Sequence, residues 1–479
     1  MMLQNRLKVF SEAEMEQIHQ NALLLLQKKG IVFQGDDAVT CFARHGAAVS
    51  GHTVFLAADM IEDALFQCPP SFLLEAPEKS RSVTVGEGLL IHPAGGEIFI
   101  ADPDGRRHSP VLADYAAIQT VYQYCDEINI GGSKPLNPID KDDRVKGLYL
   151  TLAAMRHCNK PLLTPVEEMD ERQLECLKLY QILYGDDDIF EKHYVTWHPV
   201  CSASPYCYPA HASDGIRLFA ERNQPVVLVS APMSGITGPV QLYSTVVLAL
   251  AELLAGIVYA QLIRPGVPVV PSASLTYGNM RYATWECAAP DTALLLGGMI
   301  QLFREYYKLP ARAQTGVTSS KTVDYQAGLE TMQSFLFTAL CGVNLTSQSV
   351  GSLANLLTLS PEKTVIDNEM ISRVRYMLKG MATDESAFAL DDILKTKAGG
   401  DFMTAPSTLA HFKDGWQPIV SDWRSYDTWA DDGAKGIQET AKDKVKEILA
   451  NAPDSLLDPC QEKMMTDYIR HIEKKHKIV

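Results

Sequence analysis

The sequence predicts an α/β fold, a (β/α)8 barrel in which eight parallel strands alternate with helices. Between Pro225 and Gly351 the chain repeats one pattern three times: a β-branched run, a cluster of small, aromatic and amide residues, and an apolar helix. Strands are expected mostly at intervals of about 30 to 45 residues, the length that a strand–helix unit needs. They are expected to begin near Leu89, Ile128, Pro161, Tyr194, Pro225, Val267, Pro310 and Val343. Eight such units fit a closed barrel better than an open doubly wound sheet.

The barrel, of the TIM type, is expected over residues 86–360, and different segments flank it. Residues 1–85 form an N-terminal extension, which begins with the capping box Ser11-Glu-Ala-Glu14 and a helix ending near Gly30. The alternating segment Arg81–Asp102 carries Pro93-Ala-Gly-Gly96 and is expected to be a strand and a hairpin. Residues 361–479 are richer in charge and include a helix over Ala434–Ala450, so they are expected to wrap the barrel.

Composition excludes several classes of function. The net charge of −15 and pI near 5.3 argue against a nucleic-acid partner. The first residues show no export signal, and the apolar helix from Leu242 to Gly256 is too short, and too interrupted by polar residues, to span a bilayer. Ten scattered cysteines suit free thiols in a reducing cytoplasm. We therefore expect a cytoplasmic protein with neither a nucleic-acid nor a membrane partner.

Aromatic residues gather after the predicted strands, where a barrel places its chemistry. Trp197 and Tyr206 follow the strand near Tyr194, and Tyr277, Asn279 and Trp285 follow the strand near Val267. Aromatic faces attract a quaternary ammonium ion, which cannot donate a hydrogen bond, by cation–π interaction. The alternative for each ring is that it packs beneath a loop.

Polar candidates follow the last two strands. Arg312 or Lys321 could pair with a substrate carboxylate, whereas Asp324 could serve the site or cap the next helix. Gln348 and Asn355 offer neutral hydrogen bonding where a catalytic barrel often has an ionised group.

A zinc site is a weaker interpretation of the cluster His198, Cys201 and Cys207. The spacing lacks the Cys-x-x-Cys or His-x-Cys pairs that zinc sites usually show, so no metal is expected.

The chain resembles the trimethylamine methyltransferase superfamily, in its branch without pyrrolysine. The similarity runs along almost the entire chain, and its motifs are Pro232-Met-Ser-Gly-Ile-Thr-Gly-Pro-Val240, Leu250–Gly266, Asp324-Tyr-Gln-Ala-Gly-Leu-Glu330, Glu362–Glu369 and Ser421–Trp429. The resemblance implies a barrel enzyme that demethylates an amine and passes the methyl group to the cobalt of a separate corrinoid protein. Without pyrrolysine, the implied substrate is a quaternary amine such as glycine betaine, proline betaine, carnitine or γ-butyrobetaine.

On this basis Trp197, Tyr206 and Tyr277 are expected to hold the cation, and Gln348 to position it as the catalytic residue. Arg312 or Lys321 is expected to bind the carboxylate, and Asn279 and Asp324 complete the predicted substrate site. The corrinoid belongs to the partner, so no cofactor is expected to be bound directly, and a homo-oligomer is expected.

Three differences from the family leave the identity of the substrate open. Family members often carry a His at the position of Gln348, a Glu at that of Asn355 and a His at that of Ser407. We expect these three differences to lie at or near the pocket. The alternatives are a quaternary-amine binding protein without catalysis and a zinc-dependent hydrolase.

Overall fold

Eight short parallel strands form the centre of the molecule. The computed structural model describes residues 6–102, 104–165, 171–383 and 387–478, and a strand begins shortly after each of the eight predicted starting points. These strands are β6 (Leu90–Ile91), β9 (Gly131–Gly132), β10 (Leu162–Leu163), β11 (Pro199–Cys201), β13 (Val226–Ser230), β15 (Val269–Ala273), β18 (Arg312–Gln314) and β19 (Leu345–Ser347).

Six of the strands form one parallel sheet, in the order β11-β13-β15-β18-β19-β6, and β9 and β10 form a second one. The register places Leu228 of β13 opposite Pro271 of β15. The two sheets meet where the backbone N–H groups of Asn129 and Ile130 donate to the carbonyl of Ile91 at 3.0 and 3.2 Å. The structure is therefore an α/β fold built on parallel sheets, as the sequence predicts.

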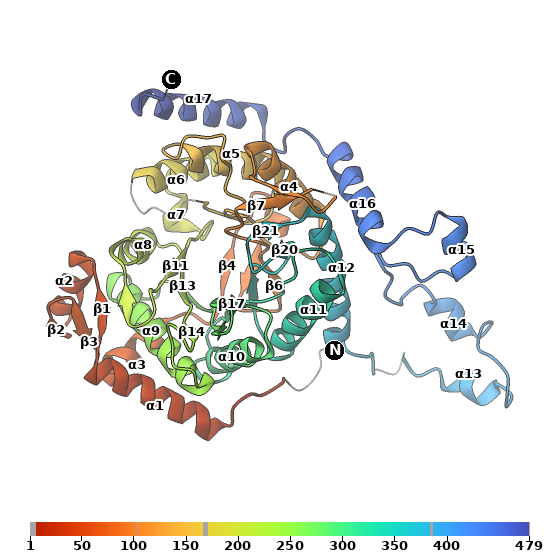
Figure 1. Cartoon of the computed structure of the whole chain (residues 1–479), viewed down its shortest axis with the longest axis horizontal. Coiled ribbons are helices and arrows are strands. Elements are labelled where there is room, and N and C mark those ends of the chain that lie inside the picture. The colour runs from red at the N-terminus through yellow and green to blue at the C-terminus, as the bar shows by residue number, and fades with distance from the viewer. Residues whose placement is uncertain (1–5, 103, 166–170, 384–386, 479) are drawn as a thin grey trace.

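Each strand leads into a helix, and these helices surround the strands (Figure 1). In the order of the strands they are α4 (Leu112–Tyr124), α5 (Lys146–His157), α6 (Glu171–Tyr184), α8 (Ala210–Glu221), α9 (Leu242–Ile263), α10 (Pro290–Gln301), α11 (Tyr325–Leu340) and α12 (Pro361–Lys379). Two short helices, α7 (Ile189–Lys192) and η2 (Leu302–Tyr306), lie between them in the chain.

Helix α9 is a core helix and is longer than predicted. Its 22 residues are long and apolar enough to cross a membrane, but 89% of the most apolar window is buried inside the protein. Gly256 lets this helix approach the strands, because a Cβ there would lie 2.4 Å from the hydroxyl of Tyr208. A buried apolar surface of this kind is typical of a helix that packs on a parallel sheet.

The N-terminal segment packs on the outside of α9. It contains α1 (Glu12–Lys28), β1 (Ile31–Phe33), α2 (Asp36–Arg44), β2 (Ala48–Ser50), β3 (Thr53–Phe55), α3 (Ala58–Gln67), β4 (Phe72–Leu74), η1 (Lys79–Arg81) and β5 (Val83–Val85). The capping box predicted at Ser11 and Glu14 is present at the start of α1. Strand β1 pairs in parallel with β12 (Cys207–Tyr208), which joins this segment to the centre.

The segment Arg81–Asp102, predicted to be a strand and a hairpin, contains short strands that pair with other segments and not with one another. The antiparallel pair is β7 (Phe99–Ala101) with β8 (Arg107–His108), and Ile100 stands opposite His108. Strand β6 is one of the central parallel strands. The residues that follow it therefore lie at the carboxyl ends of the strands. Further short strands lie after these ends: β14 (Met233–Ser234), β16 (Thr276–Asn279), β17 (Thr284–Glu286), β20 (Ser352–Leu353) and β21 (Thr358–Leu359).

The C-terminal segment wraps the molecule only in part. Helix α16 (Ile437–Asn451), close to the predicted range, packs on α4 and α12, and α17 (Pro459–Lys475) packs on α5 and α6. Helix α17 was not predicted, although Asp458 and Pro459 are typical of a helix start. Between α12 and α16, the helices α13 (Leu390–Lys395), α14 (Pro406–His411) and α15 (Tyr426–Asp431) extend away from the body (Figure 1).

Candidate functional site

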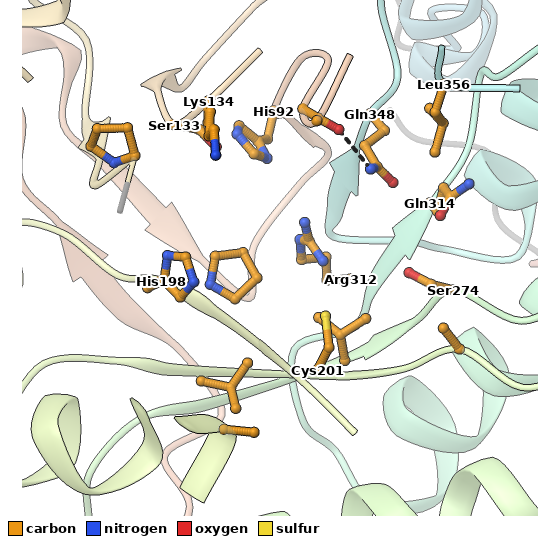
Figure 2. A pocket seen from close by; sticks show the side chains of 18 of the residues that line it. His92, Ser133, Lys134, His198, Cys201, Ser274, Arg312, Gln314, Gln348 and Leu356 are labelled. Carbon is orange, nitrogen blue, oxygen red and sulfur yellow. Dashed lines mark hydrogen bonds between the residues drawn. The ribbon is translucent and has the colours of Figure 1, made fainter. Parts of the chain in front are cut away.

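A pocket of about 460 Å³ lies at the carboxyl ends of the parallel strands, and all eight strands contribute to it. The volume is in the range of small-molecule sites. One residue from each strand end, in chain order, is His92, Lys134, Thr164, Cys201, Ala231, Ser274, Gln314 and Gln348. Figure 2 shows His92, Cys201, Ser274 and Gln348 around the pocket, with Arg312, from the start of β18, in the middle of the group.

The charged groups that line the pocket are cationic. They are Lys134 and Arg312, and no Asp or Glu stands among the described lining residues. Arg312 is 6% exposed, and its Nη1 donates to Ser272 Oγ at 2.7 Å. Within the described part of the chain its Nε–H has no hydrogen-bond partner. Burial lowers the pKa of Arg312 to about 10, so the guanidinium still carries its charge at neutral pH.

Two histidines line the same pocket in their neutral form. Burial, and then the charge of Arg312, lower the pKa of His92 to about 3, and burial lowers the pKa of His198 to about 4. Among the residues described, both ring nitrogens of His92 and the Nδ1 of His198 lack a hydrogen-bond partner. Buried polar atoms are normally satisfied, so these atoms and the Nε of Arg312 mark places where a polar ligand group would bind.

Gln348 is held firmly at the pocket edge. Its backbone has a φ of 55°, and its N–H donates to the carbonyl of Pro93 at 3.0 Å. The side-chain Nε2 donates to the carbonyl of Gly95 at 2.9 Å, the bond drawn in Figure 2. The amide oxygen takes no part in that bond, so it remains available as an acceptor at the pocket.

Trp285 supplies an aromatic face to the pocket lining. It packs on a small buried cluster made of Cys287, Val317 and Leu356, and Leu356 also lines the pocket. Apart from histidine, Trp285 is the one aromatic residue among the described lining side chains.

Of the predicted site residues, the structure brings Arg312 and Gln348 together in the pocket and places the others outside its lining. Trp197 is 0% exposed and packs with Phe72 in a core cluster. Strand β11 begins at Pro199, later than expected, so Trp197 precedes the strand instead of following it. A ring in this position cannot reach a ligand at the carboxyl ends.

The remaining predicted residues have local partners. The ring of Tyr206 lies 5.3 Å from the ammonium of Lys29, and the N–H of Tyr277 donates to Thr292 Oγ1 at 2.8 Å. Asn279 donates to Glu286 at 3.3 Å. Asp324 is the N-cap of α11 and accepts a hydrogen bond from the N–H of Ala327 at 2.9 Å. Of the two roles considered for Asp324, substrate binding and helix capping, the structure shows helix capping.

The other residues singled out in the sequence are also placed by the structure. Lys321 is exposed outside the lining. Ser407 belongs to α14, in the part of the chain that extends from the body, so the expectation that it lies at the pocket is wrong. Asn355 is adjacent to the lining residue Leu356, and its N–H donates to the carbonyl of Thr318 at 2.9 Å.

Sequence reasoning missed several lining residues. His92 directly follows the very short strand β6 and Lys134 lies two residues after β9, and these positions were the available signal for them. His198 and Cys201 were considered only as zinc ligands. Both line the pocket, whereas Cys207 lies in β12, and the described residues contain no group of three or more His, Cys, Asp or Glu placed to hold a metal.

Glu252 organises the wall of the pocket from inside α9. Its carboxylate accepts hydrogen bonds from the hydroxyls of Ser202 and Ser204 at 2.7 and 2.8 Å, and from the N–H of Tyr206 at 3.0 Å. It thus ties the turn between β11 and β12 to the helix behind it. Because Cys201 directly precedes this turn, Glu252 fixes one side of the pocket.

A small-molecule pocket with cationic side chains, at the carboxyl ends of parallel strands, defines the class: an α/β protein with a site for a small ligand. The chain belongs to the trimethylamine methyltransferase (MTTB) family, whose sequence model matches residues 2–477. This membership confirms the resemblance seen in the sequence.

Curated relatives match over nearly the whole chain. A glycine betaine methyltransferase of Desulfitobacterium hafniense (strain Y51) is 31% identical over 453 residues, covering 94% of each chain. An L-carnitine:corrinoid methyltransferase of Eubacterium limosum is 25% identical over 423 residues, covering 85% of each. A trimethylamine methyltransferase of Methanosarcina thermophila is 28% identical over 455 residues, covering 93% of each.

Solved structures show the same fold at low sequence identity. The monomethylamine methyltransferase MtmB of Methanosarcina barkeri aligns with a TM-score of 0.52 and 13% identity, over 91% of this chain and 87% of that one. The hydroxylamine complex of MtmB aligns with a TM-score of 0.53, also at 13% identity, over 92% and 89%.

Proposed function

We propose that this protein demethylates a quaternary amine that carries a carboxylate, a betaine, and transfers the methyl group to cobalt(I) of a cognate corrinoid protein. The observation that carries the proposal is the buried Arg312 guanidinium, with its free Nε–H, in a pocket without a carboxylate among its described lining residues. The names of the glycine betaine and L-carnitine relatives support the substrate class, and the second also supports the corrinoid partner.

Charge selects the substrate. A cation without a carboxylate would be repelled by Arg312, whereas a zwitterion can direct its carboxylate to Arg312. The single N–H of neutral His92, on one of its two unpartnered ring nitrogens, would donate a further hydrogen bond to that carboxylate. The methylated ammonium then lies toward Trp285, Gln314 and Gln348, which present a ring face and neutral amides.

The proposed reaction needs positioning more than acid–base chemistry. The cobalt(I) centre, on the partner protein, supplies the electron pair that takes the methyl group. The electrons of the broken C–N bond stay on nitrogen, so a quaternary amine leaves as a neutral tertiary amine and requires no proton. Neutral His92 and His198 are compatible with this, and Gln348 is held by Gly95 in a place where it can orient the ammonium.

The partner is proposed to dock over the pocket mouth. The loop after β13 and the β16–β17 hairpin expose Ile236, Val240, Met280 and Tyr282 there. The two segments lie against each other, since a Cβ on Gly278 would come within 2.9 Å of Ile236 Cδ1. Exposed apolar patches of this kind mark protein interaction sites.

The proposal includes the architecture and setting of the site. The two parallel sheets are proposed to close into a (β/α)8 barrel over residues 86–360, with residues 1–85 and 361–479 as its additions. The protein is proposed to act in the cytoplasm, to bind no cofactor of its own and to associate with copies of itself.

The test is methylation of the purified corrinoid protein, followed by the cobalt spectrum. Glycine betaine, proline betaine, carnitine and γ-butyrobetaine are compared with choline, which has the quaternary nitrogen but no carboxylate. Arg312→Gln should raise KM for the accepted betaine about 10- to 100-fold, because a buried charge-assisted hydrogen bond contributes about 1.5–3 kcal/mol.

Lys321→Gln is the matched control, because Lys321 is a cation outside the pocket, and it should leave KM unchanged. Betaine binding without any spectral change would favour the alternative of a non-catalytic binding protein. Equal turnover of choline and the betaines would contradict the role of Arg312.

A further inference from the structure

The segment between α12 and α16 contains a long stretch whose described side chains do not contribute to the hydrophobic core. From residue 387 to residue 415 no described side chain is buried. The hydrogen bonds found for this stretch join residues within it, such as the N–H of Ser407 to Asp392 at 2.9 Å. We call residues 387–415 the arm; it contains α13 and α14 and projects beside the outer helices in Figure 1.

The arm exposes large apolar side chains in a helical pattern. In α13 they stand at Leu390, Ile393 and Leu394, which share one helix face, while Asp391 and Lys395 form an ion pair on another. The exposed large apolar residues of the arm are Phe388, Leu390, Ile393, Leu394, Phe402, Met403, Leu409 and Phe412. A one-sided apolar helix face is typical of a helix that packs against another surface.

Residues 416–421, which follow the arm and which we call the root, are bound to α12 of the body. Oε2 of Glu369, in α12, accepts hydrogen bonds from three consecutive backbone N–H groups, those of residues 419–421, at 2.6 to 2.9 Å. Arg373 pairs with the other carboxylate oxygen at 2.7 Å, and its guanidinium lies 4.2 Å from the ring centre of Trp416. The root therefore fixes the direction in which the arm leaves the body.

We propose that the arm packs on a second copy of this chain, which returns its own arm in exchange. The inference rests on the self-association proposed above and names its surface. Covering these side chains would bury on the order of 1,000 Å² on one copy, and reciprocal exchange about doubles the area, which is the size of an obligate homodimer interface. Tyr376 and Met377, in the last turn of α12, are further exposed apolar side chains on the body.

A second copy fits the arm better than the corrinoid protein does. The methyl acceptor must reach the pocket mouth, whereas the arm projects outside the ring of helices (Figure 1). A partner that exchanges methyl groups must also dissociate, and transient interfaces are smaller and more polar than this surface. A permanent, strongly apolar contact is characteristic of obligate homo-oligomers.

The test is the mass of the full-length protein in solution, measured by light scattering after gel filtration. The wild type should have a mass of at least twice 52.8 kDa. The double variant Leu394→Glu/Phe412→Glu should fall to a smaller multiple, because both side chains are replaced by charges that an apolar contact cannot bury. Phe66→Glu is the matched control, because Phe66 is 92% exposed on α3, outside the arm. The mass of this variant in solution should equal that of the wild type.

The outcomes separate the arm from the other proposals. A wild type of 52.8 kDa at all concentrations would overturn self-association and the arm together. An oligomer whose mass the double variant leaves unchanged would overturn only the arm. A double variant that keeps its mass but no longer methylates the corrinoid protein would assign the arm to that partner and overturn the inference. The wild-type methylation assay tests the enzymatic function separately.

Discussion

Glu252, in the middle of α9, accepts a hydrogen bond from the hydroxyl of Ser230 at 2.7 Å, at the carboxyl end of β13. The same carboxylate accepts from the turn after β11, so one buried side chain joins a helix, a strand and a turn. In the sequence, Glu252 is a single charged residue within an otherwise apolar helix. In the structure it is the acceptor that holds the pocket wall.

Glu252→Gln should destabilise the protein by about 2–4 kcal/mol, because an amide offers one acceptor oxygen and turns an NH2 group toward hydroxyl donors. Urea denaturation measures the change, and the turn before Tyr206 should become more susceptible to proteolysis. Glu62→Gln is the control, since Glu62 is exposed on α3 and its loss should change stability by less than about 0.5 kcal/mol. Equal stability of the two variants would show that the Glu252 hydrogen bonds contribute nothing.

Trp285 should contribute to substrate binding, and Trp197 to folding. Trp285→Ala removes the ring from the pocket lining and should raise KM for the betaine by the equivalent of about 0.5–2 kcal/mol. Trp197→Ala empties a buried site and should cost about 3–5 kcal/mol of stability. Tyr277→Ala, outside the lining, is the control and should leave KM unchanged. A rise in KM for Tyr277→Ala but not for Trp285→Ala would restore the aromatic site expected from the sequence.

The positions of the eight strands could be predicted because most of them lie in or directly beside a buried apolar run bounded by turn residues, and such a run can be recognised from neighbouring residues alone. Side-chain direction could not be predicted in the same way. A strand that begins a few residues late, as β11 does, moves Trp197 from the ligand side to the core. The role of Glu252 depends on partners 22 to 50 residues away, and such contacts have no local signature.

Glu97 gives the protein a pH-dependent stability. It is fully buried just after Gly95 and Gly96 of the pocket, and burial raises its pKa to about 8. The folded state therefore keeps a proton on Glu97 that the unfolded state loses above its ordinary pKa near 4.5. This contribution to stability is complete below about pH 4.5 and is lost as the pH rises toward 8.

Glu97→Gln removes this titration while keeping the shape of the neutral side chain. The melting temperature of the variant minus that of the wild type should become more positive from pH 5 to pH 8, and should level off above about pH 8. Differential scanning fluorimetry across this range measures the difference, and Glu87→Gln, at an exposed position, should give a flat line. A flat line for Glu97→Gln as well would mean that the carboxyl group is already ionised in the folded protein at pH 5, and that burial does not hold its proton.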